Sequence, residues 1–331
     1  MTTTPSLRDR TALVLGATGG VGGEAARQLV AAGWHVRALT RRDPLAGKTV
    51  DGIEWRRGNA MRADDVASAA EGVAVIVHAV NPPGYQHWAE QVVPMIDNTI
   101  AAAVAEGATV VLPGTVYNFG PDAFPVLREG APQHPVTRKG AIRVELEKRL
   151  REAATRGARA IVVRAGDFFG PQPGNSWFSQ GLVAPGKPVT VIRSPARRGV
   201  GHQWAYLPDV ARTMVALLER RDTLPAFCDV HFKGHWDNDG TEMPRAIQRV
   251  AARHGQKATI KAFPWWAMPL IAPFVPTIRE LLEMRYLWKT PVRMTNDVLL
   301  GLLGEEPHTP LDRAVEATLA GLGCLPGRQA G

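Results

Sequence analysis

The stretch that decides the fold is Leu-Val-Leu-Gly-Ala-Thr-Gly-Gly-Val-Gly-Gly, residues 13–23. Residues 11–15 form a short apolar run typical of a buried strand, and residues 21–32 carry apolar side chains at helical spacing. Glycines between a strand and a helix let the backbone turn sharply and approach a pyrophosphate, which the first N–H groups of the helix bind. The stretch therefore predicts a dinucleotide-binding loop rather than a tight turn without a ligand. The residues expected to contact the cofactor here are Gly16, Thr18, Gly19, Gly20, Val21 and Gly22.

Strand and helix signals alternate from this loop to residue 165. Further strands are predicted at residues 36–39, 53–56, 73–79, 109–112 and 160–164, and helices at residues 64–70, 88–105, 138–155 and 209–220. The run at 73–79 is almost continuously apolar, as expected of a parallel strand that is buried on both faces. We predict a doubly wound α/β fold, in which helices cover a parallel sheet and ligands bind at the carboxyl ends of the strands.

The pattern changes after residue 170. Residues 170–195 are rich in Gly, Pro and polar side chains, and beyond residue 223 we predict a short strand at 227–232 and helices at 244–254 and 277–288. Two closely packed parts are therefore expected. Residues 1–170 and about 200–222 would form a dinucleotide-binding Rossmann domain, and residues 171–199 and 223–331 a smaller, C-terminal substrate-binding cap.

The composition limits the class of protein. The 331 residues are 45% hydrophobic with a net charge of +8, and the longest apolar stretch, residues 263–276, contains four prolines. Because a membrane span needs roughly 20 apolar residues without such breaks, we expect no membrane helix, and the polar N-terminus predicts no signal peptide. The two cysteines, Cys228 and Cys324, exclude a Cys-rich zinc site or a disulfide framework and favour a cytoplasmic location. The scattered arginine pairs indicate a solvated basic surface or attraction of an anionic small molecule, and no nucleic-acid partner.

Several later segments agree with the glycine loop. The glycines are spaced GxxGxxG, and Val-His-Ala-Val at 77–80, Val-Tyr at 116–117, Arg164 with Gly-Pro at 170–171, and Tyr-Leu-Pro-Asp-Val-Ala at 206–211 follow in order. Over residues 10–220 this series resembles the extended, atypical branch of the short-chain dehydrogenase/reductase superfamily, which is epimerase/dehydratase-like. The resemblance implies that Ala79 and Val80 lie beside the nicotinamide ribose, and that a homodimer forms through the two long helices.

The end of the second strand indicates which dinucleotide binds. An acidic residue at this position accepts hydrogen bonds from the ribose of NAD, but this strand ends Thr40-Arg41-Arg42. A guanidinium matches a 2′-phosphate in charge and in bidentate geometry. We therefore predict NADP(H), bound by Arg41 and Arg42; the alternative is that both arginines are solvated surface residues. Asn59 is expected near the adenine.

The catalytic motif of the superfamily, a Tyr-x-x-x-Lys on one helix face, does not occur in this sequence. The resemblance puts Lys139 at the tyrosine position and Arg143 at the lysine position. Lys139 is then either a proton donor, since burial beside Arg143 and the nicotinamide favours the neutral amine, or a ligand of the cofactor ribose. Tyr117, on a loop that faces the cleft in relatives, is a second candidate for catalysis or a packing residue. Tyr85 and His87 are candidates for a lid, or are loop surface.

Two weaker patterns remain. His231 and His235 stand four residues apart, but a predicted strand and Gly234 keep the two rings from sharing a face, so we predict no metal site. The side chains expected to wall either a substrate pocket or an ordinary core between the two parts are Phe168, Phe169, Asn175, Trp177, Phe178, Trp265 and Trp266.

These patterns together predict a function. We expect hydride transfer between NADPH and a carbonyl or activated alkene of a small molecule, with a proton supplied by the protein. Sugar-nucleotide epimerisation or dehydration is the enzymatic alternative. A redox sensor that binds NADP(H) without turnover is the alternative from another class, because it needs the glycine loop but no catalytic pair.

Overall fold

The computed structural model describes residues 8–42, 44–82, 87–174 and 176–326. Its centre is an eight-stranded sheet in the order β12-β8-β6-β5-β1-β2-β4-β3, in which all neighbouring strands are parallel except β3 and β4. The strands are β1 (Thr11–Leu15), β2 (His35–Thr40), β3 (Thr49–Val50), β4 (Ile53–Arg57), β5 (Val75–His78), β6 (Thr109–Gly114), β8 (Arg159–Ala165) and β12 (Phe227–Phe232). The chain winds outward from β1 to β4, then crosses back to β5 and winds the other way. The predicted doubly wound parallel fold is confirmed.

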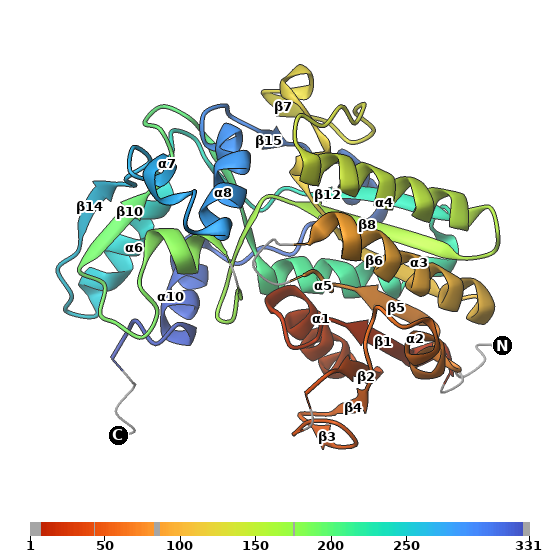
Figure 1. Ribbon diagram of the computed structural model, residues 1–331. Helices are drawn as coiled ribbons and strands as arrows, with labels where there is room; N and C mark the ends of the chain where they lie inside the picture. The colour runs from red at the N-terminus through yellow and green to blue at the C-terminus, as the bar shows by residue number, and fades with distance from the viewer. Residues whose placement is uncertain (1–7, 43, 83–86, 175, 327–331) are drawn as a thin grey trace.

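Helices cover both faces of this sheet (Figure 1). On one face lie α1 (Gly20–Ala31) and α5 (Leu207–Leu218), and on the other α2 (Ala63–Ala70), α3 (Trp88–Glu106) and α4 (Arg138–Ala154). The alternation of β1 explains the two layers, because Ala12 and Val14 pack in the α1/α5 core while Leu13 and Leu15 pack in the α2/α3/α4 core. All four side chains are at most 1% exposed, as expected of a parallel strand that is covered on both faces.

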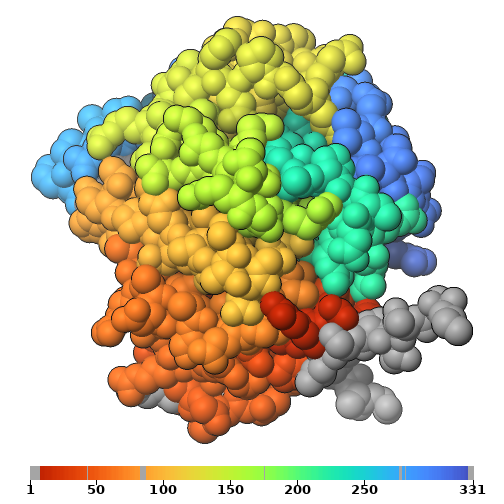
Figure 2. All heavy atoms as spheres, turned by 90° about the vertical axis from the view of Figure 1, so that its right-hand side faces the viewer, coloured from red at the N-terminus to blue at the C-terminus, as the bar shows by residue number. Residues whose placement is uncertain are grey.

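The cap is a separate hydrophobic unit beside the carboxyl edge of the sheet (Figure 1). Its strands β10 (Val191–Ser194) and β14 (Thr259–Ala262) pair in parallel, and α6 (Glu242–Arg253) and α10 (Leu311–Gly321) pack with them. Two shorter helices, α7 (Met268–Ile271) and α8 (Pro276–Glu283), follow β14. The opposite end of the molecule, seen in Figure 2, is built mostly from orange to yellow-green segments of the first half of the chain.

A small third sheet joins the two parts. It contains β9 (Asp167–Phe169), β11 (His202–Tyr206) and β13 (His235–Asp237), with β11 in the middle. A fourth sheet consists of β7 (Val126–Leu127) paired in parallel with β15 (Arg293–Met294). Because β9 follows β8 after one residue, this third sheet begins directly at the carboxyl edge of the central sheet.

Two expectations about the second half of the chain are wrong. The sequence pattern places residues 227–232 in the cap, but β12 is the edge strand of the central sheet and pairs with β8 from Phe227 opposite Ala160 to Phe232 opposite Ala165. Helix α9 (Asp297–Leu303) also packs on β12, through Leu299 in the α1/α5 core. The helix expected at 277–288 ends at Glu283 and continues as a 3-10 turn, Met284–Trp288.

Within the described ranges, no helix is long and apolar enough to cross a membrane. Cys228 and Cys324 are both buried as free thiols, one in the α1/α5 core and the other in the cap core. Burial raises the pKa of the Cys228 thiol to about 11, which keeps it protonated and unreactive at neutral pH.

Candidate functional site

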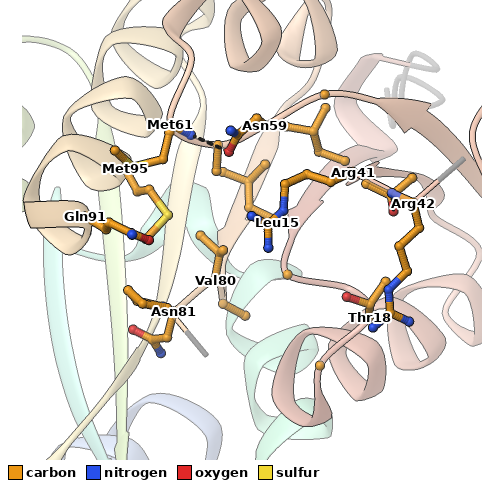
Figure 3. Close-up of a pocket in the computed structure, with 18 residues that line it drawn as sticks. Leu15, Thr18, Arg41, Arg42, Asn59, Met61, Val80, Asn81, Gln91 and Met95 are labelled. Atoms are coloured by element: carbon orange, nitrogen blue, oxygen red, sulfur yellow. Dashed lines mark hydrogen bonds between the residues drawn. The ribbon is translucent and has the colours of Figure 1, made fainter. Parts of the chain in front are cut away.

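A cleft of about 540 Å³ opens along the carboxyl ends of β4, β2, β1 and β5, where the winding of the sheet reverses (Figure 3). Open α/β sheets bind their ligands at this place. The predicted cofactor residues that line the cleft are Gly16, Thr18, Gly19, Arg41, Arg42, Asn59, Ala79 and Val80. Residues from four segments that are separate in sequence are therefore brought together in one cleft.

The glycine loop is built by close backbone contacts. Gly16 has a φ of +90°, and a Cβ there would lie 2.6 Å from the carbonyl oxygen of Ala79. A Cβ on Gly22 would collide with the carbonyl oxygen of Gly16, so α1 can lie against the loop only with glycine at this position. A Cβ on Gly19 would meet only that oxygen, at 3.3 Å. The packing of the loop therefore depends less on Gly19 than on Gly16 and Gly22. The lack of a side chain at Gly19 instead keeps the cleft in front of it open.

Helix α1 begins at Gly20, directly behind this loop. Gly20, Val21 and Gly22 stand in its first turn, where N–H groups have no partner within the helix and can bind an anion. None of the three lines the main cleft; Gly20 lines a neighbouring hollow of about 440 Å³ beside residues 171–174. Their contact with a cofactor remains a prediction.

The Arg41 and Arg42 side chains extend from the end of β2 into the cleft, between the glycine loop and the Asn59 segment (Figure 3). In the part of the chain that the structure describes, neither guanidinium forms an ion pair, and no described residue that lines the cleft carries a carboxylate. The Asn59 amide oxygen accepts a hydrogen bond from the Met61 N–H (3.1 Å), and the Asn59 N–H donates to Asp65 Oδ2 (2.8 Å). The Asn59 loop, which lines the cleft beside the two arginines, is thus held in shape by its own hydrogen bonds.

The segment after β5 forms the other end of the cleft. Asn81 lines it, and the Asn81 Oδ1 atom accepts a hydrogen bond from Arg143 of α4 (3.3 Å). Arg143 is only 5% exposed and lies over the Trp88 ring, 5.3 Å from its centroid. Burial, with a contribution from the Arg143 charge, lowers the pKa of His78 to about 3, so this imidazole is neutral and bonds Thr99. Arg143 therefore supports the cleft through Asn81 and does not itself line it.

Lys139 lies in a different cavity, of about 390 Å³, between the starts of α3 and α4 and helix α8. Its ammonium is 2.7 Å from Glu283 Oε2, and the Arg138 N–H donates to Glu283 Oε1 at 2.7 Å. Burial alone raises the pKa of Glu283, but the hydrogen bond and charge of Lys139 lower it below its ordinary value. Sequence reasoning missed Glu283, because 144 residues separate it from Lys139. His87, the lid candidate, lines this cavity, and Tyr85 lies outside the described residues.

A smaller cavity, about 60 Å³, opens at the carboxyl ends of β6 and β8, the strands beyond β5. Tyr117 lines it from the 3-10 turn Val116–Asn118 and also packs in the cluster around Phe119 and Met284. Tyr117 therefore borders a cavity and also packs in a core, and its catalytic role stays a prediction. The remaining lining residues are Gly114, Thr115, Val116, Ala165, Gly166, Asp167, Phe168, Ser176 and Trp177.

The aromatic residues expected to wall a substrate pocket divide between this cavity and the cap. Phe168 and Trp177 line the cavity. Phe169 and Phe178 are fully buried behind it and stack on each other with their ring centroids 5.8 Å apart. Trp265 packs against Trp177 with their ring centroids 5.5 Å apart. Trp266 is 78% exposed and Asn175 lies outside the described residues. Most of these side chains therefore form the core of the cap.

A buried charge network holds the floor of the small cavity. Arg164 is 0% exposed and binds Glu147 of α4 at 2.8 Å, Asp229 of β12 at 2.9 Å, and the Thr115 carbonyl oxygen at 2.7 Å. Burial raises the pKa of Glu147, but the Arg164 charge overrides it and holds that pKa below its ordinary value. Burial dominates at Asp229 and raises its pKa. Arg164 thus ties three elements to the loop that carries Tyr117.

The other titratable groups do not form a metal site in the described part of the chain, which contains no group of three or more His, Cys, Asp or Glu side chains positioned to hold an ion. Burial lowers the pKa of His231 to about 3 and of His235 to about 4, so both rings are neutral. His235 packs against Phe169 and His308 instead.

Comparison with known proteins agrees with this geometry. Residues 12–228 match the NAD dependent epimerase/dehydratase family. Among solved structures, that of gox2253 is 21% identical with a TM-score of 0.71, covering 96% of this chain and 100% of that one. A putative epimerase from Burkholderia cenocepacia J2315 is 19% identical with a TM-score of 0.70, covering 95% and 98%. UDP-glucose 4-epimerase from Brucella ovis in complex with NAD is 15% identical with a TM-score of 0.71, covering 95% and 98%.

These identities establish a shared fold. No curated protein matches the chain. The family match covers both the glycine loop and the strands that form the two cavities, and it agrees with the resemblance seen in the sequence. The chain belongs to the NAD-dependent epimerase/dehydratase family, the extended branch of the short-chain dehydrogenase/reductases.

Proposed function

We propose that this protein is an NADP(H)-dependent oxidoreductase that transfers hydride between the cofactor and a carbonyl or activated alkene of a small molecule. The observation that carries the choice of cofactor is the pair Arg41 and Arg42, which enter a cleft with no carboxylate among its described lining residues. A 2′-phosphate gains charge-assisted, bidentate hydrogen bonds from guanidinium groups, whereas the ribose hydroxyls of NAD favour an acidic acceptor. A solvated position of both arginines is the competing interpretation.

The residues present fit such a dinucleotide. The glycine loop borders the middle of the cleft: Gly16 and Gly22 pack against backbone atoms, and Gly19 borders open space. When bound, the cofactor supplies or accepts a hydride. The glycine loop and the start of α1 would bind the pyrophosphate, and Asn81, held by Arg143, would shape the wall beyond β5.

The substrate would lie over β6 and β8, next to the end of the cleft at β5. The small cavity there is lined by Tyr117, Phe168 and Trp177, which suit a compact, largely apolar molecule. Tyr117 would orient this molecule, and Lys139 would act at the cofactor ribose only if it left Glu283. The cap would exclude water from the reacting atoms.

A sugar-nucleotide epimerase or dehydratase is the second candidate, and the family match and the epimerase structures favour it. The missing Tyr-x-x-x-Lys motif counts against it, since that reaction needs a proton to be removed and returned at the sugar. An NADP(H)-binding sensor without turnover is the third outcome that an experiment must separate.

The test is an NADPH-oxidation screen of the full chain against aldehydes, ketones and enones, with calorimetric titration of NADPH and NADH and a parallel assay of UDP-glucose with NAD. Turnover of a carbonyl or enone with preferential NADPH binding supports the proposal. Interconversion of UDP-sugars would support the epimerase instead. Tight NADPH binding without any turnover would support the sensor.

A further inference from the structure

A carboxylate and an imidazole are paired at the small cavity. The Asp167 Oδ2 atom lies 2.7 Å from His202 Nε2. Asp167 begins β9 and His202 begins β11, and 35 residues separate them in sequence. Their distance is short enough for a proton to be shared between the two groups.

Asp167 is the member of the pair that faces the cavity. It lines the cavity with a side chain 19% exposed, whereas the His202 side chain is 8% exposed and does not line it. The arrangement places a carboxylate in contact with the cavity and an imidazole behind it, which is the order needed for a proton to be passed to a bound molecule and replaced.

The imidazole is held rigidly. The His202 ring stacks on Trp288, with centroids 3.7 Å apart and planes at 9°, and meets the edge of Trp204 at 5.1 Å. Because both tryptophans are buried, the ring cannot turn away from Asp167 without breaking the cap core. A fixed partner of this kind keeps a catalytic carboxylate in one position.

Two hydroxyl groups that line the cavity, those of Thr115 and Ser176, are hydrogen-bonded within their own loops. Thr115 Oγ1 donates to Asn118 Oδ1 at 3.0 Å, and Ser176 Oγ lies 3.1 Å from Ser179 Oγ. Among the described lining residues, Asp167 and Tyr117 are the titratable ones, and Asp167 has an imidazole bonded to it. The superfamily's own proton-transferring pair does not occur in this sequence, so the reaction needs another donor.

The cavity is also placed for chemistry. It lies at the carboxyl ends of β6 and β8, and β6 is the neighbour of β5, whose end forms the far wall of the dinucleotide cleft. A cofactor that runs along the cleft from β2 across β1 to β5 therefore presents its reactive end towards this cavity.

We propose that Asp167 is the catalytic acid and base of this protein and that His202 is its positioning residue and proton store. This inference rests on the proposed function, since it supplies the proton of that hydride transfer. In reduction, hydride adds to the carbonyl carbon, the π electron pair moves to oxygen, and that oxygen takes a proton from Asp167. Asp167 takes that proton from His202 Nε2, so the pair begins as imidazolium and carboxylate and ends as neutral imidazole and carboxylate. The product gains one hydride and one proton, and the pair loses one proton; oxidation runs in reverse.

The experiment measures single-turnover NADPH oxidation at saturating cofactor with two probes, para-nitrobenzaldehyde and cyclohexenone. The variants are Asp167→Ala, Asp167→Glu and His202→Phe, the last of which keeps the ring stack on Trp288 and removes the hydrogen bond. A matched control is Asp122→Ala, because Asp122 and His134 form an exposed pair with the same 2.7 Å separation away from the cavity. NADPH affinity and the midpoint of thermal unfolding are measured for every variant.

We expect Asp167→Ala to lower the rate by about 10²–10⁴-fold, the usual effect of removing a positioned acid, with NADPH affinity unchanged. Added formate restores part of that rate, because it supplies a carboxylate to the vacated space, and Asp167→Glu retains more activity than Asp167→Ala. His202→Phe gives a smaller loss. Asp122→Ala matches the wild type with and without formate.

A wild-type rate in Asp167→Ala would overturn the inference and leave the proposed function standing. A lost rate that neither formate nor Asp167→Glu restores, together with a lower unfolding midpoint, would make the pair structural and also overturn it. A wild type that binds NADPH but oxidises it with neither probe would contradict the proposed function itself, and the proton role with it.

Discussion

Substituting Gly19 with valine separates binding from folding at the glycine loop. Gly19 has φ −94° and ψ 175°, a conformation open to any residue, and its Cβ would meet only the Gly16 carbonyl oxygen, at 3.3 Å. We therefore expect the folding free energy to change by less than about 1 kcal/mol. The branched side chain would instead occupy the cleft in front of α1, where the pyrophosphate would lie.

The loss of affinity can be worked out from the bonds at stake. A hydrogen bond to a charged group contributes about 1.5–3 kcal/mol, and each 1.4 kcal/mol is about a factor of ten in affinity. Displacing the pyrophosphate breaks at least two such bonds, so NADPH should bind Gly19→Val at least about a hundredfold more weakly.

Gly22→Ala is the matched control, because its Cβ would collide with the Gly16 carbonyl oxygen. It should lower the free energy of unfolding by about 1–3 kcal/mol, as overpacking does, and so reduce the unfolding midpoint without cofactor. The assays are calorimetric titration with NADPH and thermal unfolding of the apo protein. Unchanged NADPH affinity in Gly19→Val would refute the assignment of this loop to the phosphates.

Four further predictions concern the cofactor preference, Lys139, Glu283 and the oligomeric state. Arg41→Ala should remove about a tenfold to hundredfold preference for NADPH over NADH, measured by titration, and a wild type that prefers NADH would contradict this. Lys139→Met should weaken NADPH binding if Lys139 serves the ribose, and unchanged affinity would leave Glu283 as its partner. Because the pKa of Glu283 is lowered in the fold, the stability from this pair is present above pH 4.5 and is lost as pH falls below it; Glu283→Gln should flatten this acid limb in chemical unfolding. Sedimentation should detect the predicted homodimer, and a monomer at all concentrations would exclude it.

The sequence predicts the first half of the chain well because local signals dominate there. The glycine loop is recognised by its motif, and the strands and helices by the spacing of their apolar residues. The position of the cleft then follows from where the strands end. The arginines at the end of β2 were found for the same reason, since their position follows from the end of a strand.

The errors lie where contacts join distant segments. Strand β12 follows a change in composition that predicts the cap, but its pairing with β8 puts it in the central sheet. Asp167 and His202 are 35 residues apart and belong to no local sequence motif. They come together because β9 pairs with β11 in the third sheet. Glu283 closes on Lys139 across the boundary between the two parts. No local pattern could predict these contacts.

The most direct test of the account is the fate of a labelled hydride. The full chain is given NADPH carrying deuterium at the transferable position, together with para-nitrobenzaldehyde or cyclohexenone, and the product is analysed by mass spectrometry. The account predicts a reduced product that carries deuterium on carbon and an equal amount of NADP⁺. NADPH that binds tightly and keeps its label, with both probes unchanged, would contradict it.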